Sequence, residues 1–155
     1  STGSEIHKKE FIPKLAKLQK IGSFCLTEEK IGSEAHEIST NYNETSDAFI
    51  LNGDKRWIGN ANFDNSLLII IARDIKNEKN FKGFLVDANT LGINVTKIKG
   101  KLSMRMVQNC CIDIKNVVVK KESVLPGINK FEDVSNLLQK SRLVLCYGMI
   151  GGVIG

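Results

Sequence analysis

The sequence has 155 residues, a hydrophobic fraction of 42% and a net charge of +5, from 22 Lys and Arg against 17 Asp and Glu. A chain of this length can bury roughly 68–70% of the surface that it exposes when unfolded, which is enough for one core. The composition excludes a disordered or fibrous class. The basic excess permits a partner that carries phosphate, although a lysine-rich solvated surface explains it as well.

The cysteines and histidines form no metal or disulfide pattern. The four cysteines have no CxxC spacing, and they are Cys25, Cys110, Cys111 and Cys146. Reduced, intracellular cysteines are therefore expected. His7 and His36 are too few and too isolated for a metal site, so we predict that the chain binds no metal.

The beginning of the chain is predicted to be helical. Thr2 and Glu5 have the spacing of a capping box, and apolar residues follow on a lysine-rich segment that Pro13 interrupts. We expect two short helices or one kinked helix, ended by Gly22. No apolar segment follows a basic start, so the pattern of a signal peptide is not found.

The middle of the chain has the pattern of a β-sheet. The run Ser66–Ala72 is apolar after its serine and includes three consecutive β-branched isoleucines, which predicts a strand buried on both faces. Further strands are predicted at Gly83–Val86 and Ile93–Ile98. The strand pattern of residues 112–119 changes phase at Lys115-Asn116, which predicts a β-bulge. Closely spaced strands without helices between them favour a mainly β fold, a small antiparallel barrel or sandwich.

The segment Asp47–Asn60 is predicted to be a β-hairpin. Asn52-Gly53 tolerates the positive φ angles of a type I′ turn, and apolar runs flank it. Trp57, the only tryptophan, lies on the predicted return strand just before Gly59. A large aromatic residue at a strand end suggests a planar ligand, and packing in the core is the alternative interpretation.

The segment Thr27–Ser33 follows a short extended run and is predicted to be a loop. Its threonine, glycine and serine could present hydroxyl and amide N–H groups to a phosphate or a heterocycle. An ordinary turn is the alternative.

The end of the chain is predicted to be a helix. After Gly127 the apolar period changes from about two to about 3.6 residues, so a helix is expected from Phe131. The run Leu143–Gly155 is apolar and has no helix-stop residues. It is too short and too rich in glycine for a membrane span. We expect a helix cut in mid-course, and hence a fragment of a longer protein.

Two motifs, in order and at a similar separation, resemble the middle domain of the acyl-CoA dehydrogenase and oxidase flavoenzymes. The first, Phe24–Glu34, has Thr-Glu-Glu and Gly-Ser-Glu where the family has Thr-Glu-Pro and Gly-Ser-Asp. The second, Asn52–Asn60, ends in Trp-Ile-Gly-Asn where the family has Trp-Ile-Thr-Asn. The resemblance continues to Ser141-Arg142. Gly59 and the run Arg105–Asn109 are similar to plant short-chain peroxisomal acyl-CoA oxidases and to glutaryl-CoA dehydrogenases.

The resemblance implies three parts of the chain. Residues 1–21 would end an N-terminal helical domain, residues 22–130 would form a small antiparallel β-barrel, and residues 131–155 would begin a C-terminal helical domain. The implied fold is therefore mainly β, a barrel flanked by fragments of two helical domains.

The resemblance also implies an FAD site and an acyl-CoA site. The implied cofactor-binding residues are Phe24, Leu26, Thr27, Gly32, Ser33, Trp57, Ile58 and Gly59. The Thr27 hydroxyl would bond to the polar edge of the flavin, and Trp57 would pack on the face away from the substrate. The implied substrate-binding residues are Ser33, Ser141 and Arg142.

Several positions depart from the family pattern. Gly59 lacks the hydroxyl of the family's threonine, and Glu29 and Glu34 in place of proline and aspartate would loosen the loop and lower the affinity for FAD. The family takes its catalytic base from far down the C-terminal domain or from the position of Ser141, where a serine cannot serve without a partner. We therefore predict no catalytic residue and no turnover in this chain alone, with Glu28 and Glu34 as poor substitutes.

The implied function of the full-length protein is that of an FAD-dependent acyl-CoA dehydrogenase, which oxidises an acyl-CoA thioester to the trans-2-enoyl-CoA in fatty acid β-oxidation. An electron-transfer flavoprotein or, in an oxidase, oxygen would accept the electrons. A mitochondrial or peroxisomal homo-oligomer is implied, with no nucleic acid or membrane partner. A flavin-free, non-catalytic relative is a second hypothesis. A nucleic-acid-binding barrel is a third, although the aromatic residues are not interleaved with Lys and Arg as stacking requires.

Overall fold

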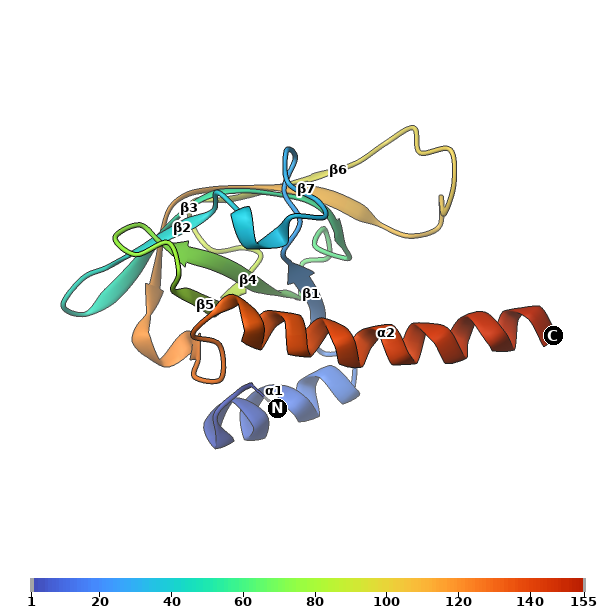
Figure 1. The fold of residues 1–155 in the computed structure, drawn as a ribbon, viewed down its shortest axis with the longest axis horizontal. Helices are drawn as coiled ribbons and strands as arrows, with labels where there is room; N and C mark the ends of the chain where they lie inside the picture. The colour runs from blue at the N-terminus through green and yellow to red at the C-terminus, as the bar shows by residue number, and fades with distance from the viewer. Residues whose placement is uncertain (1, 155) are drawn as a thin grey trace.

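The computed structural model describes residues 2–154 as a mainly β fold with two α-helices (Figure 1). The outer limits of the first and last predicted domains, residues 1 and 155, lie outside the described residues. Both helices lie on the same side of the sheet, and α2 extends beyond it. The helices are α1 Glu5–Ala16 and α2 Phe131–Ile154, with short 3-10 helices η1 Ala35–Glu37 and η2 Lys121–Ser123. The strands are β1 Ile21–Cys25, β2 Asn41–Glu44, β3 Ala48–Gly59, β4 Ser66–Asp74, β5 Phe81–Asp87, β6 Ile93–Lys97, β7 Asn109–Lys120 and β8 Val124–Leu125.

β4 is the central strand of the sheet. It pairs with β5 along one edge, and along the other with β1 over its first half and with β2 at its end. Leu68, Ile70 and Ala72 enter the inner core, the buried cluster enclosed by the strands. Ile71 enters the helix-side core, the buried cluster under α2. The prediction of a strand buried on both faces is confirmed.

The eight strands form one mixed sheet in the order β6-β7-β3-β2-β4-β5-β8, with β1 beside β4. The β1–β4 and β2–β4 pairs are parallel, so the expectation of a wholly antiparallel sheet is wrong there. The mainly β class is confirmed. Within residues 2–154 the strands β6 and β8 end the sheet without pairing with each other, so a closed barrel stays a prediction. The sheet forks at β4, because the chain leaves β1, passes through residues 26–40 and returns to the same edge as β2.

The predicted hairpin turn at Asn52-Gly53 is wrong. β3 runs unbroken from Ala48 to Gly59 and passes through the dipeptide. The turn lies earlier, between β2 and β3, where the Thr45 N–H and hydroxyl donate to the Ala48 carbonyl at 2.9 and 2.8 Å. Asn52 instead accepts the N–H of Asn116 on β7 at 2.8 Å. Residues that tolerate positive φ suit a sheet irregularity as well as a turn, and local sequence does not separate the two.

Gly53→Ala is expected to lower the free energy of unfolding by about 2–3 kcal/mol. Gly53 has a φ of 145°, and a Cβ there would lie 2.6 Å from the Cα of Thr40, a backbone atom that cannot turn aside. Gly59→Ala is the control on the same strand, since a Cβ at Gly59 has no atom within 4 Å. Urea unfolding compares the two variants, and equal stabilities would contradict the prediction.

The β-bulge predicted at Lys115-Asn116 is confirmed. The pairing of β3 with β7 steps from Leu51–Val117 to Gly53–Ile114, so β7 has one residue more than β3 in this interval. Asn116 has a φ of 50°, which Asn tolerates better than most residues.

α1 is a single helix that contains Pro13, so the alternative of two short helices is wrong. The helix begins after Ser4, not Thr2. The Ser4 hydroxyl accepts the N–H of His7 at 3.2 Å, and His7 Nδ1 accepts the N–H of Ser4 at 3.3 Å. The capping box therefore uses Ser4 and His7 in place of Thr2 and Glu5, because an imidazole nitrogen can act as the acceptor that a carboxylate was expected to supply.

α2 covers the helix-side core with its first turns only. Val134 is fully buried, and Phe131 and Leu138 pack against the same cluster. The predicted helix from Phe131 is thus confirmed. Further along α2 the exposed apolar side chains are Leu143, Val144, Leu145, Tyr147, Met149, Ile150 and Val153. Neither helix described between residues 2 and 154 is long and apolar enough to cross a membrane.

Candidate cofactor site

The candidate site lies where the loop after β1 meets the end of β3. The pairing of β3 with β7 steps there from Lys55–Ile112 to Ile58–Cys110, so this β-bulge belongs to β3. It contains Trp57, whose φ of 63° is unusual for a bulky residue and costs on the order of 1–3 kcal/mol. The bulge directs the indole outward, since Trp57 is 50% exposed. Bulges and strained residues of this kind are frequent beside functional sites.

Thr27 and Trp57 belong to two backbone segments that are hydrogen-bonded to each other. The N–H of Arg56, the residue before Trp57, donates to the Thr27 carbonyl at 2.8 Å. Thr27 is partly exposed and Trp57 is half-exposed. The alternative that Trp57 packs in the core is therefore wrong.

A buried ion pair lies next to these two residues, and sequence reasoning missed it. The Lys55 Nζ atom lies 2.9 Å from Oε1 of Glu28 and 3.1 Å from the Leu26 carbonyl, and the two charged side chains are 0% and 2% exposed. Glu28 also accepts the N–H and the hydroxyl of Ser39 at 2.7 and 2.6 Å and the N–H of Thr40 at 2.9 Å. Both carboxylate oxygens of Glu28 are thus engaged within the protein.

Glu28 is held as a carboxylate by its neighbours. Burial by itself raises the pKa of Glu28, but the Lys55 ammonium and the hydrogen bonds from Ser39 and Thr40 outweigh it and lower the pKa to about 2. Burial lowers the pKa of Lys55, and Glu28 opposes that effect. A carboxylate with so low a pKa is a weak proton acceptor, which argues against Glu28 as a general base.

Acid is expected to destabilise the fold through Glu28 between about pH 4.5 and 2. The pKa of this carboxyl is near 4.5 in the unfolded chain and about 2 in the fold, so the unfolded state binds more protons in this window. Stability therefore falls as the pH falls through the window. Glu28→Gln lacks this contribution, so urea unfolding across the window should show a shallower profile for the variant. Parallel profiles of wild type and variant would refute the expectation.

Glu29 ties the loop after β1 to β3. Its carboxylate pairs with the guanidinium of Arg56, which lies over the Trp57 ring at 5.4 Å from the centroid. The N–H of Glu29 donates to Asp54 Oδ2 at 3.2 Å. The side chain and N–H of Glu29 therefore add two links that a proline could not make, which argues against a loosened loop, and the lower affinity for FAD stays a prediction.

The rim of the site, by which we mean Thr27, Trp57, Gly59 and the exposed loop residues 32–34, has open space beside its polar groups. A Cβ built on Gly59 or on Gly32 has no atom within 4 Å, and Ser33 and Glu34 are exposed. Ile58 is buried, so only its backbone could face a ligand. A partly exposed hydroxyl, a half-exposed indole and open glycine backbone fit a flat heterocycle with polar edges. The residues present therefore fit a flavin.

An apolar groove of about 430 Å³ lies between β1 and α2. Its lining residues are Phe24, Leu137, Leu138, Lys140, Ser141 and Val144. The groove brings Phe24, predicted for the cofactor, together with Ser141, predicted for the substrate. The Ser141 hydroxyl donates to the Leu138 carbonyl at 2.8 Å. Arg142 and Ser33 are exposed and do not line this groove.

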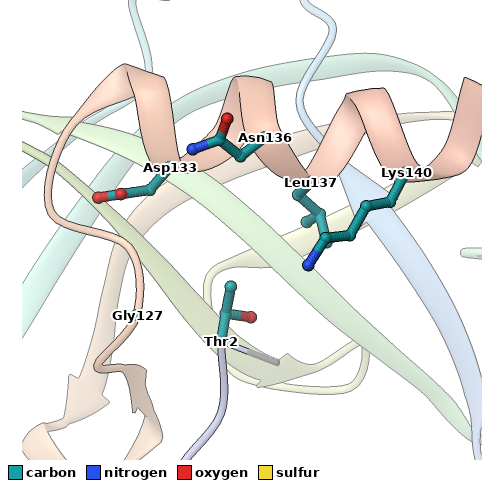
Figure 2. Close-up of a pocket in the computed structure, with 6 residues that line it drawn as sticks. All are labelled: Thr2, Gly127, Asp133, Asn136, Leu137 and Lys140. Carbon is teal, nitrogen blue, oxygen red and sulfur yellow. The ribbon is translucent and has the colours of Figure 1, made fainter.

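A second hollow, of about 200 Å³, lies between the start of the chain and α2 (Figure 2). Asp133 of this hollow accepts the N–H groups of Asn129 and Lys130 at 2.9 and 3.1 Å, so it caps α2. The Gly127 N–H donates to the Thr2 carbonyl at 2.9 Å. These contacts hold the residues before α1 against the start of α2, and we assign the hollow a structural role.

The cysteines described in residues 2–154 are free thiols. Cys25 and Cys110 are buried, and burial raises the pKa of Cys25 to about 12. Among the residues that the structure describes, no three His, Cys, Asp or Glu side chains gather at a point where they could hold a metal ion.

A mixed sheet with both helices on one side, carrying a half-exposed indole beside a hydroxyl-bearing loop, defines a mainly β domain. The family follows from comparison with known proteins. The sequence model described as Acyl-CoA dehydrogenase, middle domain, matches residues 23–117, from β1 into β7. The chain therefore belongs to the acyl-CoA dehydrogenase family.

Individual relatives agree with this assignment. The short/branched chain specific acyl-CoA dehydrogenase, mitochondrial, of Rattus norvegicus is 29% identical over 153 residues, which cover 96% of this chain and 35% of that protein. A glutaryl-CoA dehydrogenase structure from Mycobacterium smegmatis matches with a TM-score of 0.88 and 28% identity, over 96% of this chain and 37% of that one. A structure of a glutaryl-CoA dehydrogenase from the same organism in complex with FADH2 matches with a TM-score of 0.79 and 32% identity, over 85% and 33% of the two chains. The chain thus spans about a third of the length of these relatives.

Proposed function

We propose that the full-length protein is an FAD-dependent acyl-CoA dehydrogenase that oxidises an acyl-CoA thioester to the trans-2-enoyl-CoA. The observation that carries the proposal is the hydrogen bond between Arg56 and Thr27, which joins the threonine loop to the bulge that exposes Trp57. The relative solved with FADH2 and the acyl-CoA substrates in the names of the relatives support it. The bound flavin would supply the hydride acceptor, which no amino-acid side chain can replace.

The roles of this chain's residues in the proposal are binding and orientation. Thr27 would donate its hydroxyl to the polar edge of the ring, and the Trp57 indole would pack on the face away from the substrate. Leu26 is buried, and its carbonyl accepts a hydrogen bond from the Lys55 ammonium. We therefore assign the contact of Leu26 with the flavin to its backbone N–H. Gly32 and Ser33 would reach the phosphate region, as their exposure permits.

The substrate would enter along the apolar groove. Phe24 and Ser141 line it, and Arg142 is exposed at the next position of α2, where it could meet the anionic CoA. Glu28 is already bound to Lys55 and is therefore not assigned as the base. The relatives are about three times as long as this chain, so the carboxylate that acts as the base would come from the part of the full-length protein that lies outside it.

The wider setting is also part of the proposal. Residues 22–130 would be the middle domain and would form a closed barrel. Residues 1–21 would belong to a helical domain that precedes it in the chain, and residues 131–155 to one that follows it. The rat relative's name includes "mitochondrial", which favours a mitochondrial place in fatty acid β-oxidation over a peroxisomal one. An electron-transfer flavoprotein would be the acceptor and a homo-oligomer the assembly.

The absorption spectrum of the purified full-length protein tests the proposal. Visible flavin bands that bleach when acyl-CoA is added are expected. A colourless protein that FAD cannot reconstitute would favour the flavin-free relative, and bands that no acyl-CoA bleaches would refute the dehydrogenase.

An acyl-CoA oxidase is the second candidate, favoured by the open space at Gly59. A glycine leaves room for oxygen where the family's threonine would place a side chain. Measuring hydrogen peroxide against electron transfer to a flavoprotein acceptor separates the two. Gly59→Thr should lower peroxide formation if oxygen enters there.

Trp57→Ala is expected to raise the dissociation constant for FAD by about tenfold or more, because the variant loses one wall of the ring site. Phe63→Ala is the control, since Phe63 is also a partly exposed aromatic residue but lines a different hollow, together with Asn89 and Ile93. Titration of the full-length apoprotein with FAD measures both constants. Equal constants for the two variants would remove Trp57 from the site.

A further inference from the structure

We propose that the buried Lys55–Glu28 ion pair is the positioning device of the cofactor site, which sets Thr27 against Trp57 without touching the flavin itself. The inference rests on the proposed function, because the site that it describes is the FAD site of that function. Neither residue belongs to the rim, and both are buried.

The bonds of Lys55 go to the two residues that flank Thr27. Its Nζ atom reaches the Leu26 carbonyl at 3.1 Å and Glu28 Oε1 at 2.9 Å. The Arg56 N–H holds the Thr27 carbonyl between them at 2.8 Å. Three consecutive residues of the loop are thus bound to two consecutive residues of β3, immediately before Trp57.

Strand pairing does not make this connection. β1 has β4 as its partner, and no ladder joins β1 to β3 in the part of the chain that the structure describes. The end of β1 therefore lies at the fork of the sheet. There the backbone N–H of Arg56 on β3 is free to bind Thr27, and the side chain of Lys55 is long enough to reach Leu26 and Glu28. The surface pair Glu29–Arg56 adds to the connection but is exposed to screening by salt.

Glu28 also fixes the far end of the same loop. It accepts hydrogen bonds from Ser39 and Thr40, and the Thr40 hydroxyl donates to the Asp54 carbonyl on β3 at 3.0 Å. The Glu28 N–H donates to the Ile31 carbonyl at 3.0 Å. The loop that carries Ser33 is therefore closed through the same carboxylate.

Stability alone does not account for an ion pair in this place. A buried ion pair loses the hydration of both charges, and apolar residues of similar volume often give an equally stable or more stable protein. Apolar side chains would not fix the loop in one register, whereas the pair makes several directional bonds on both sides of Thr27. The geometry therefore matches a device for orientation.

The test uses the full-length protein and two variants, Lys55→Met and Glu28→Gln. Glu28→Gln keeps the shape of the side chain and removes its charge, so it decides the matter if Lys55→Met does not fold. Val119→Ala is the matched control, because it weakens the buried end of the β3–β7 pair that lies away from Trp57. Lys30, exposed in the loop, is a reporter for trypsin cleavage of the apoprotein.

Both variants are expected to raise the dissociation constant for FAD by about tenfold or more, to change the visible circular dichroism of the flavin at saturating FAD, and to speed cleavage after Lys30. Val119→Ala should stay within about threefold of the wild-type constant and leave the flavin signal unchanged, although it too is less stable. A merely structural role of the pair would move stability and leave the flavin signal as it is.

The failures of the two proposals are distinguishable. Wild-type protein that binds FAD, together with variants that bind it equally well and give the same flavin signal, overturns the positioning role alone. Wild-type protein that binds no FAD overturns the proposed function, and the positioning role falls with it.

Discussion

Lys55→Met is expected to lower the free energy of unfolding by about 3–5 kcal/mol, because it leaves the Glu28 carboxylate buried without its ion-pair partner. The hydrogen bonds from Ser39 and Thr40 remain, so part of the charge stays compensated and the lower end of the range is expected. Urea unfolding at neutral pH, followed by circular dichroism, measures the loss.

A double-mutant cycle separates the pair from its surroundings. Combining Lys55→Met with Glu28→Gln should cost less than the sum of the single changes, with a coupling of about 0.5–3 kcal/mol. Lys14→Met is the control, since Lys14 pairs with Glu10 at 3.2 Å on the exposed face of α1 and should change stability by less than about 1 kcal/mol. Strict additivity in the cycle would contradict the buried pair.

Phe84→Ala is expected to destabilise the fold by about 3–5 kcal/mol, because it opens a cavity in the inner core. Phe84 is fully buried on β5, and its ring meets those of Tyr42 and Phe49 edge-on, with centroids 5.5 and 5.3 Å away. Such ring pairs contribute about 0.5–1.5 kcal/mol each beyond the area that they bury. The loss is measured as the change in urea midpoint at constant slope.

Two further variants define the origin of that loss. Phe84→Leu keeps most of the buried volume and should cost clearly less than Phe84→Ala. Phe63→Ala removes an aromatic ring that is 40% exposed and should cost about 1 kcal/mol or less. A Phe84→Ala loss no larger than that of Phe63→Ala would show that the inner core does not depend on the aromatic contacts.

The spacing of apolar residues predicted those elements in which burial follows a regular pattern along the chain. Leu67–Ala72 is apolar at every position because β4 has buried clusters on both faces. The phase change at Lys115-Asn116 identified a bulge, since an extra residue reverses the alternation. The helix from Phe131 followed from a change of period. In each case the side-chain pattern is a local record of which face is buried.

The wrong prediction of a turn at Asn52-Gly53 is also the reason why the buried Lys55–Glu28 pair was not predicted. Reading a turn there divided β3, although Lys55 stands in phase with the buried Phe49 and Leu51. With the strand kept whole, Lys55 would have been recognised as an inward-facing charge, which requires a partner. The partner could still not have been named, because Glu28 lies in a loop that meets β3 only through the fork of the sheet.

The motifs supplied candidate residues for the rim, and the tertiary structure showed how the backbone that carries Thr27 and Trp57 is held. From the sequence alone came the mainly β class, the central strand, the final helix and the family resemblance, because each depends on patterns between near neighbours in the chain. Only the folded structure showed the parallel pairing at β4, the bulge at Trp57 and the buried Lys55–Glu28 pair. These features depend on contacts between segments that are distant in the sequence, and such contacts leave no periodic trace in it.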